Sequence, residues 1–482
     1  RPLPMDLIPR VVTATEWRVV SEGVAQRIRA LEAFLADVYD RGDIMRDGVV
    51  PKSLVTSSSH YHRQAHGIVP ANGVRIHVAG VDLVRDEEGT FHVLEDNLRC
   101  PSGVSYVLEN RRTLAHVAPE VFTGYRVAPV TEYPERLYRA LAAAAPRDVH
   151  DPTVVVLTPG VYNSAHFEHA FLARRMGAEL VEGRDLFCRG GFVYMRTTQG
   201  PQPVHVIYRR LDDEYLDPVQ FHADSVLGVP GLLNAARAGA VTIANGVGNG
   251  VADDKALYPY VPKIIEYYLG EKAILPNVPT HDLMDPEVRE YVLERLDKMV
   301  IKPVDGSGGY GLVIGPKSTD AELAEVAEAI KADPRSWIAQ PVVTLSTSPT
   351  VGTGGRVQPR HLDLRPFAVN DGKKIWVLPG GLTRVAMKAG SLVVNSSQGG
   401  GSKDTWVLAG TGEEDDGASL SAEAVLEARR LNRGLPTGGP ITPRVSLPHT
   451  HEARMRQQEE QQQQQSYSAP QVDAIAEADP SC

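Results

Sequence analysis

Cysteine is scarce in this chain of 482 residues, which holds only Cys100, Cys188 and Cys482. The three residues lie far apart and form no Cys-x-x-Cys pair, so their spacing supports neither a disulfide framework nor a structural zinc site. The scarcity favours reducing surroundings, and we expect a cytoplasmic protein.

Long apolar runs and a leader sequence are lacking as well. No stretch approaches the roughly 20 apolar residues that a membrane-spanning helix needs, so no membrane association is expected. The chain begins at Arg1 without a charged-then-apolar leader, so no signal peptide is expected. Because the initiator Met is missing, we expect a trimmed or fragmentary N-terminus.

An excess of basic residues is also lacking. The formal net charge of -10 argues against a nucleic-acid-binding protein, whose contact surface should be basic. It leaves room for a locally positive pocket that binds ATP. The hydrophobic content of 42% and the charged content of 23% are ordinary for a soluble protein, and the length allows about two to four domains.

The hydrophobic pattern changes along the chain and divides it into parts. In residues 1–149 the apolar periodicity predicts helices and a hairpin. These cover 16–40 (helix), 74–97 (hairpin), 101–118 (turn, then helix) and 133–145 (helix). Residues 150–250 alternate between short apolar strands and a helix, which predicts an open α/β domain. The strands cover 153–157, 178–181, 204–208 and 241–244, and the helix covers 167–176.

The second half of the chain continues this alternation and then loses it. In residues 251–410 we expect helices over 255–269, 285–298 and 318–332, and strands around Lys302 and over 337–343 and 361–408. Residues 411–482 combine an acidic stretch and a glutamine run with few aromatic or branched apolar residues. We therefore expect a mostly disordered tail there, with a short helix near 421–431.

The segment 299–315 (MVIKPVDGSGGYGLVIG) carries the clearest chemical signal. A strand that contains Lys302 leads into a glycine-rich loop and leaves as a second apolar strand. The loop fits G-x-G-x-x-G at Gly306, Gly308 and Gly311, but a Rossmann loop would open a helix and a Walker loop would end in Gly-Lys-Ser/Thr. A hairpin over nucleotide phosphates remains, with Lys302 supplying positive charge. The alternative is a glycine-rich surface hairpin.

The second signal is a hairpin with acidic residues on both strands. We place its turn at Glu88-Gly89. Asp82 then lies opposite Glu95, and Asn97 shares the face of Glu95. Opposed carboxylates repel, whereas a bound cation would turn the repulsion into attraction, and Asp, Glu and Asn oxygens suit Mg²⁺ held with phosphates. The alternative is a solvated polar edge of the hairpin.

Together these segments resemble the ATP-grasp superfamily, specifically the circularly permuted type 2 proteins of bacteria, which are related to glutathionylspermidine synthetase. Glu95-Asp96-Asn97 followed by Pro101-Ser102-Gly103 resembles the family's Glu-x-Asn and Pro-Gly turn, and 254–259 (DKALYP) resembles its Lys-Ala-Leu-x-Pro segment. In an ordinary ATP-grasp protein the Glu-x-Asn follows the lysine strand. Here it precedes Lys302 by about two hundred residues, as circular permutation would produce.

The resemblance covers roughly residues 5–408 and implies a circularly permuted ATP-grasp fold of the α/β (α+β) class. It implies that 1–149 carry the metal hairpin, that 150–250 form an inserted open α/β domain of the pre-ATP-grasp type, and that 251–410 carry the lysines, the glycine loop and the adenine hinge. The disordered tail, 411–482, would follow.

The resemblance also implies ATP and Mg²⁺ as cofactors and gives roles to individual residues. Lys255 and Lys302 would contact phosphates, and Asp82, Glu95 and Asn97 would bind the metal. The rest of the nucleotide site would be Gly306, Ser307, Gly308, Gly309, Gln340 and Val342. Gly80 stands where glutathionylspermidine synthetases place a transition-state arginine. The candidates for that role are Arg63, Arg209, Arg210, Arg365 and Arg384.

The implied reaction forms an amide through an acylphosphate. We therefore predict an ATP- and Mg²⁺-dependent carboxylate–amine ligase that acts on small molecules or peptides, with a protein partner as a further option. One alternative is a phosphotransferase on the same fold. The other is a catalytically inactive scaffold. Gly80, in place of the expected arginine, supports the scaffold alternative, whereas the intact charged site residues argue against it. The amidase domain of bifunctional relatives is absent from the chain, so polyamine and glutathione specificity is not carried over.

Three remaining features invite a chemical interpretation. His60, His62 and His66 share no single face of a strand or helix, so we expect them to hold a loop or bind the substrate carboxylate rather than a metal. Cys100 lies near the metal hairpin, but acylphosphate chemistry needs no protein nucleophile. Residues 399–404 (GGGSKD) are expected to form a loop, either capping the acyl-substrate site or serving as a flexible turn.

Overall fold

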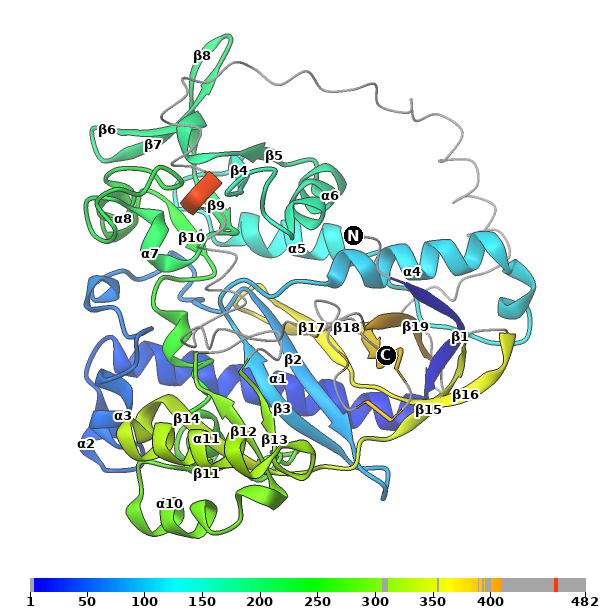
Figure 1. The fold of residues 1–482 in the computed structure, drawn as a ribbon. Coiled ribbons are helices and arrows are strands. Elements are labelled where there is room, and N and C mark those ends of the chain that lie inside the picture. The colour runs from blue at the N-terminus through cyan, green and yellow to red at the C-terminus, as the bar shows by residue number, and fades with distance from the viewer. Residues whose placement is uncertain are drawn as a thin grey trace, which may run out of the picture.

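A six-stranded sheet lies at the centre of the computed structural model, which describes residues 4–305, 311–352, 355–388, 390–391, 394, 400–409 and 455–457. Its strand order is β1 (Met5–Val12), β19 (Gly401–Val407), β18 (Ile375–Val385), β17 (Arg365–Asn370), β2 (Val78–Arg85) and β3 (Phe91–Asn97). β1 and β19 run parallel, and the other neighbours are antiparallel. Segments from both ends of the described chain thus share one sheet (Figure 1), as a permuted order predicts.

Helices cover both faces of this sheet. They are α1 (Ala14–Val38), α4 (Val104–Val117) and α5 (Tyr133–Ala143). Along β17, Ala368 packs with the cluster around α1, whereas Phe367 and Val369 pack with the cluster around α4 and α5. Because alternate side chains of a strand point to opposite faces, α1 covers one face and α4 and α5 cover the other. The helices predicted over 16–40, 101–118 and 133–145 are these three.

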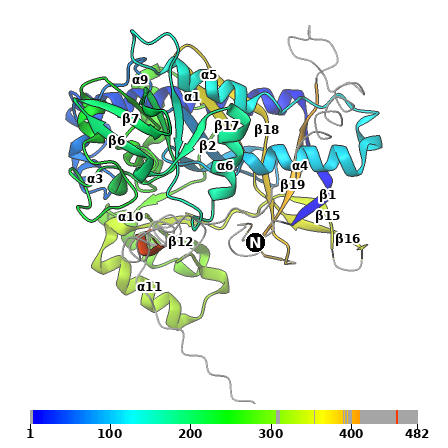
Figure 2. The ribbon, with the colours of Figure 1, turned by 90° about the horizontal axis from the view of Figure 1, so that it is seen from above.

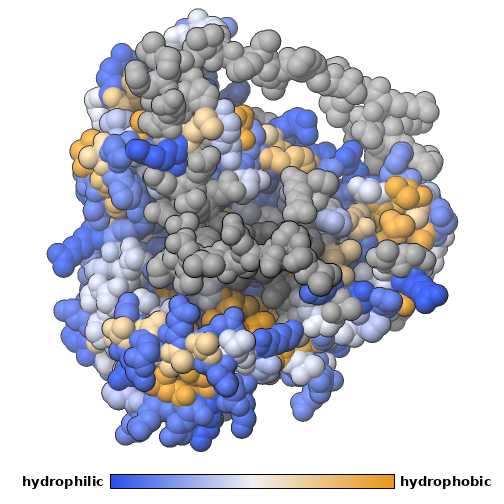
Figure 3. Space-filling model, in the orientation of Figure 1, coloured by the Kyte–Doolittle hydropathy of each residue, from blue (hydrophilic) through white to orange (hydrophobic). Residues whose placement is uncertain are grey.

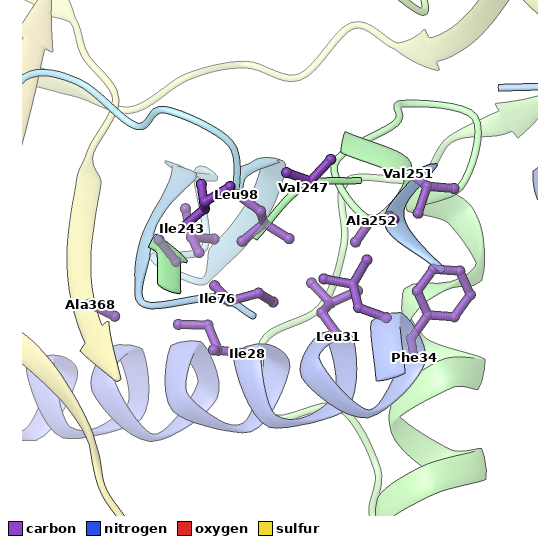
Figure 4. Close-up of a cluster of buried hydrophobic side chains, with 14 of the residues drawn as sticks. Ile28, Leu31, Phe34, Ile76, Leu98, Ile243, Val247, Val251, Ala252 and Ala368 are labelled. Atoms are coloured by element: carbon purple, nitrogen blue, oxygen red, sulfur yellow. The ribbon is translucent and has the colours of Figure 1, made fainter. Parts of the chain in front are cut away.

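The largest hydrophobic cluster lies along α1 (Figure 4). Ile28, Leu31 and Phe34 point from this helix toward Ile76, just before β2, and toward Val251 in a connecting segment. Burying side chains of this size contributes about 1.5–3 kcal/mol each relative to exposure. The contacts join residues far apart in the sequence, so α1 fixes the central sheet against the parts that follow it.

The predicted open α/β unit forms a parallel sheet with the order β10 (Thr242–Ala244), β9 (Val206–Arg209), β4 (Val154–Leu157) and β5 (Glu179–Val181). The helix predicted over 167–176 is α6 (His166–Met176), which Gly177 ends with φ of 70°. An antiparallel sheet, which the sequence analysis missed, interrupts this unit: β6 (Leu186–Arg189), β7 (Phe192–Thr197) and β8 (Gly200–Val204). β7 begins with a continuous apolar run, 192–195, and β8 holds two prolines, so no regular alternation of apolar and polar residues marks these strands.

A small antiparallel sheet carries Lys302. Its order is β11 (His281–Asp282), β14 (Trp337–Pro341), β12 (Met299–Pro303) and β13 (Val313–Ile314). It packs with α10 (Pro286–Leu293) and α11 (Asp320–Ala332) around its own hydrophobic cluster, and Figure 2 shows this part projecting from the rest of the molecule. The helix predicted over 285–298 ends early, because a 3-10 turn at Leu296–Lys298 leads into β12.

The remaining elements are short or connect the sheets. They are α2 (Asp43–Arg46), α3 (Lys52–Thr56), α7 (Asp213–Leu216), α8 (Leu232–Arg237), α9 (Val261–Leu269), β15 (Thr347–Val351) and β16 (Val357–His361). The helix predicted over 255–269 begins only at Val261, after a 3-10 turn at Tyr258–Tyr260. Apart from 455–457, the predicted tail 411–482 with its helix near 421–431 lies outside the described residues. The boundaries between the predicted parts stay a prediction.

Polar side chains cover most of one described face of the molecule. On the face shown in Figure 3, hydrophilic residues dominate and hydrophobic ones occur in small groups. Among the described residues, no helix is both long and apolar enough to span a bilayer.

Candidate active site

The acidic hairpin is formed by β2 and β3, and the predicted pairing of Asp82 with Glu95 is confirmed. The turn occupies residues 86–90, so its centre differs slightly from the predicted centre at Glu88-Gly89. This difference alone would shift the pairing register of the two strands by one residue. A bulge at Leu94 shifts it back by one residue. The predicted pairing is thus correct because two deviations cancel.

Asp82 is fully buried and binds two arginines. Arg365 donates from Nε and Nη2 to its two oxygens, the second bond being 2.8 Å long, and Arg384 donates from Nη2 to Oδ2 at 2.5 Å. Asn97 Nδ2 lies 3.4 Å from Oδ1. Burial alone would raise the pKa of Asp82, but the two arginines outweigh burial and hold that pKa well below its usual range.

Arg384 links Asp82 to a second buried carboxylate, Asp363. Its Nε lies 3.0 Å from each oxygen of Asp363. Burial raises the pKa of Asp363, although Arg384 opposes the shift. Two of the five candidate arginines, Arg365 and Arg384, therefore lie together at the hairpin, where two carboxylates balance their charge.

Gly80 explains how Arg365 reaches this position. A Cβ built on Gly80 would lie 3.2 Å from Cβ of Pro101 and 3.3 Å from Cδ of Arg365. The stem of Arg365 therefore fills the space that a side chain at position 80 would need. Gly80 stands where glutathionylspermidine synthetases place an arginine. In this chain the neighbouring strand β17 supplies a guanidinium there, that of Arg365, which also donates from Nη1 to the carbonyl of Ser102 at 3.2 Å.

A small cavity lies beside this charged group. Its lining residues are Leu94, Glu95, Asp96, Asp253, Asp254, Lys255, Tyr258, Lys302 and Ile338. Glu95 stands between the cavity and the arginines, since its Oε2 lies 3.8 Å from Nζ of Lys255 and its Oε1 lies 3.8 Å from Nη2 of Arg365. The cavity and the arginine group thus form one continuous site.

Lys302 reaches the cavity from β12 and is held by Gln340. In the antiparallel register Val300 faces Gln340, so Lys302 and Gln340 are diagonal neighbours on one face. Nζ of Lys302 donates to Oε1 of Gln340 at 2.6 Å, and Nε2 of Gln340 donates to Thr280 at 2.8 Å. Burial lowers the pKa of Lys302 to about 8, against the attraction of Glu95.

The other predicted nucleotide contacts are only partly described. Val342 follows the end of β14 and is half-buried. Gly306, Ser307, Gly308 and Gly309 lie outside the described residues. Gly311, at the end of the predicted loop, has φ of 70°, in the left-handed region that glycine favours.

Three of the five candidate arginines lie away from the hairpin carboxylates. Arg63 is exposed in a 3-10 turn. Arg209 is fully buried, and its guanidinium binds the carbonyls of Asn245, Leu211 and Gly246 and pairs with Asp213 at 2.9 Å. Arg210, also buried, donates to Pro101, Tyr208 and Ser102. Arg209 and Arg210 therefore hold the structure behind the site.

Sequence reasoning missed the residues that position Lys255. Asp254 accepts from Arg335 at 2.6 Å and from Ser58, and Asp253 accepts from the backbone N–H of Leu98 at 2.9 Å. These bonds tie the segment before Lys255 to the end of the hairpin. The pair Asp253-Asp254 directly before Lys255 was a visible signal, but its partners are distant in the sequence.

The structure describes the surroundings of Cys100 and of part of the loop predicted over 399–404. Burial raises the pKa of the Cys100 thiol, so it is not activated as a nucleophile. The loop predicted over 399–404 was wrong for Gly401–Asp404, which belong to the buried strand β19, where Lys403 pairs with Asp6 at 2.6 Å. Within the described ranges, no three His, Cys, Asp or Glu side chains are arranged to hold a metal.

Comparison with known proteins decides the family. The sequence model of circularly permuted ATP-grasp type 2 matches residues 9–386. The chain belongs to this family. Membership confirms the resemblance and the fold class, and at a coarse level it indicates an ATP-grasp ligase that joins a carboxylate to an amine.

Relatives of this ATP-grasp chain occur in several bacteria. It is 61% identical over 436 residues to an uncharacterized protein of Mycobacterium tuberculosis, covering 90% of this chain and 78% of the relative. It is 53% identical over 411 residues to an uncharacterized protein of Synechocystis, covering 85% of each. It is 46% identical over 409 residues to a Frankia casuarinae protein named "Putative glutamate–cysteine ligase 2-2", covering 84% of this chain but 47% of that protein.

The ATP-grasp family implies a bound Mg²⁺, and the residues fit it in part. Glu95, with a side chain 30% exposed, and Asn97 offer hard oxygens beside the cavity. Asp82 is different, because both its oxygens accept hydrogen bonds from Arg365 and Arg384. It can join a metal site only after Arg365 has released it.

Proposed function

We propose that this protein is an ATP- and Mg²⁺-dependent carboxylate–amine ligase that works through an acylphosphate. The observation that carries the proposal is that Lys255, Lys302 and Glu95 line one cavity beside Arg365. A triphosphate and a substrate carboxylate repel each other, so a site that holds both needs several fixed cations. Family membership and the intact charged residues support the same class of reaction.

The proposed roles follow from where each side chain lies. Lys255 and Lys302 bind phosphate oxygens, and Gln340 orients Lys302 through the 2.6 Å hydrogen bond. Glu95 and Asn97 hold Mg²⁺, which when bound neutralises charge on the phosphates. Arg365, once released from Asp82, stabilises the transferring phosphoryl group together with Arg384. The remaining residues proposed for the nucleotide are Gly306, Ser307, Gly308, Gly309 and Val342.

The reaction would proceed in two displacements. The substrate carboxylate attacks the γ-phosphorus of ATP, and the bond to ADP breaks. The amine nitrogen then attacks the carbonyl carbon, the bond to phosphate breaks, and the nitrogen's proton leaves with the phosphate. The name of the Frankia relatives describes a reaction of this class, but this chain spans less than half of those proteins, so neither glutamate nor cysteine is assigned as a substrate here. A cytoplasmic location is part of the proposal.

The test is a phosphate-release assay with pooled carboxylic acids and pooled amines. The wild type should release phosphate from MgATP only when both pools are present. Glu95→Ala should lower that rate by at least about 100-fold, because a fixed group at the phosphates is lost, while its melting temperature stays unchanged. Glu87→Ala, at an exposed position in the turn of the same hairpin, is the matched control and should keep full activity.

Each other outcome of this assay contradicts a defined part of the proposal. Unchanged release by Glu95→Ala would remove the metal assignment. Release with the acid pool alone, with a phosphorylated acid accumulating, would favour a phosphotransferase. Tight MgATP binding without release under any pool would favour a scaffold.

A further inference from the structure

A second small cavity lies where the segment before β2 meets β10 and the end of α8, and it shares no lining residue with the ATP cavity. It has room for roughly one water-sized molecule. Its wall is mostly apolar, and the apolar lining residues include Ile68, Val241, Ile243 and Val247. Because Arg75 also lines it, it is called the Arg75 cavity below.

Arg75 brings a buried positive charge to this cavity, since the residue is only 6% exposed. Its Nη2 donates to the carbonyl of Ile68 at 3.0 Å, and its guanidinium lies over the ring of Tyr39, 5.5 Å from the ring centre. Within the described ranges, the guanidinium makes no other hydrogen bond and no ion pair. A guanidinium carries several N–H donors in a fixed fork, so the described chain leaves most of them unused.

Glu32 attracts the guanidinium of Arg75 but forms no ion pair with it in the described structure. Its two oxygens instead accept the backbone N–H groups of Arg75 at 2.6 Å and of Ile76 at 2.8 Å. Burial lowers the pKa of Arg75, and the attraction of Glu32 and Tyr39 opposes this shift only in part. Buried charges are normally paired, so this guanidinium lacks an anionic partner.

The rest of the wall does not neutralise Arg75. None of the described residues that line the cavity is acidic. The hydroxyl of Thr242, also in the wall, donates to the carbonyl of Ala144 at 2.6 Å, so its proton is used elsewhere. A bound water would fill the space but leave the charge uncompensated. A buried cation beside a small, mostly apolar space therefore favours an anion over a water, an amine or a metal ion.

We propose that the Arg75 cavity binds one monovalent anion of about the size of chloride. A single guanidinium balances one negative charge, and the small size of the cavity excludes phosphates and nucleotides. Val69, which is 68% exposed, forms part of the wall, so the cavity borders the surface and an ion has a short way in. This binding site is independent of the proposed ligase function.

The bound anion stabilises a junction between the acidic hairpin and the parallel sheet. The carbonyl of Arg75 accepts the N–H of Gly246 at 2.8 Å and Nδ2 of Asn249 at 2.9 Å. Nδ2 of Asn249 also donates to the carbonyl of Leu98, at the end of the hairpin, at 3.1 Å. Only the folded protein holds the cavity, so an anion that binds there raises the stability of this junction by mass action.

Chloride NMR tests the site by direct binding. The chloride line broadens when the ion exchanges with a protein-bound site, and the broadening is compared for the full chain, Arg75→Gln and Arg147→Gln at equal concentration. Arg147 is exposed, and its variant loses the same charge, so it is the matched control. We expect the wild type and the control to broaden the line alike. Arg75→Gln should broaden it at least about threefold less, because exposed charges hold ions only weakly.

Competing anions separate the cavity from the surface. Bromide or acetate is added to the wild type at constant ionic strength, with gluconate as the filler. Bromide is close to chloride in size and should remove the broadening, whereas acetate is too large for the cavity and should not. Displacement by acetate as strongly as by bromide would point to ions on the surface and overturn the proposal.

A wild-type crystal soaked in bromide gives a second measurement that needs no variant. The anomalous signal of bromide should lie in the cavity, within hydrogen-bond distance of the Arg75 guanidinium. A water there without a bromide signal, or equal chloride broadening by all three proteins, would overturn the proposal. If Arg75→Gln fails to fold, its unfolding curve reveals this, and the bromide position decides. A failed phosphate-release assay would contradict the ligase function alone, because neither measurement here uses ATP.

Discussion

At the residue scale, burial determines the pH range in which the side chain of Lys302 carries its charge. Its pKa is lowered from the ordinary 10.5 to about 8 because charge is disfavoured in a buried position. Between these two values the unfolded chain holds a proton that the folded protein has lost, so this lysine makes stability rise with pH in that window. Nucleotide binding should follow the opposite trend, because phosphates need the charged form.

ATP affinity should therefore fall as the pH rises above about 8, by up to about tenfold per pH unit. Lys302→Arg keeps a charge throughout this range, so its ATP affinity should be nearly independent of pH between 7 and about 9.5. Calorimetry at several pH values measures both proteins. A wild-type affinity that stays constant across this range would show that Lys302 does not face the phosphates.

If the proposed function is correct, Arg365 and a metal ion compete for the carboxylate of Asp82. In nucleotide-free protein, Arg365→Met should strengthen Mn²⁺ binding, measured by electron paramagnetic resonance, because Oδ1 of Asp82 becomes available. The same variant should lose ligase activity by about 100-fold or more, since a cation at the phosphoryl group is missing. Arg356→Met, at an exposed position just before β16, is the control. Equal Mn²⁺ affinity in both variants would exclude an exchange at Asp82.

At the level of elements, β3 serves the site and the core at once. Its alternation directs Glu95 and Asn97 toward the site and Asp96 toward α1. There Arg27 donates from Nε and Nη2 to Asp96, both at 2.7 Å, and both side chains are 2% exposed. The guanidinium also stacks on Tyr258, 5.4 Å from the ring centre.

Breaking this pair should loosen the hairpin from α1. Arg27→Met leaves Asp96 buried and unpaired, so we expect a loss of about 3–5 kcal/mol in the free energy of unfolding, measured in urea. Arg139→Met removes an exposed pair with Glu135, whose side chains are 72% and 61% exposed, and should cost less than about 1 kcal/mol. Similar losses in the two variants would mean that the Arg27–Asp96 pair does not anchor the hairpin.

The sequence predicted helices and strands well where apolar periodicity was strong. It predicted them poorly where contacts with distant segments determine the structure. The helices along α1, α4, α5, α6 and α11 and the strands of the parallel sheet followed from local pattern. β1 was missed because it is an edge strand paired with β19, from the far end of the described chain. Gly401–Asp404 were expected in a loop because of their glycine and polar residues, yet Lys403 is buried against Asp6.

At the scale of the whole molecule, the site is assembled from segments far apart in the chain. The hairpin lies near the start, Lys302 and Gln340 lie in the small sheet, and Arg365 and Arg384 lie in strands that return to the hairpin. The family resemblance predicted the residues of the hairpin and the lysines. The route of Arg365 over Gly80 could not be predicted from the sequence, because it depends on a contact between distant segments.

The central claim is that a carboxylate is phosphorylated before the amide forms, and oxygen transfer tests it most directly. The acid identified in the phosphate-release assay is labelled with ¹⁸O in its carboxylate and turned over with MgATP and the amine. The account predicts that each phosphate released carries one ¹⁸O atom, because the bond from the acyl carbon to the transferred oxygen breaks in the second step. Phosphate without ¹⁸O, released at the same rate, would contradict it.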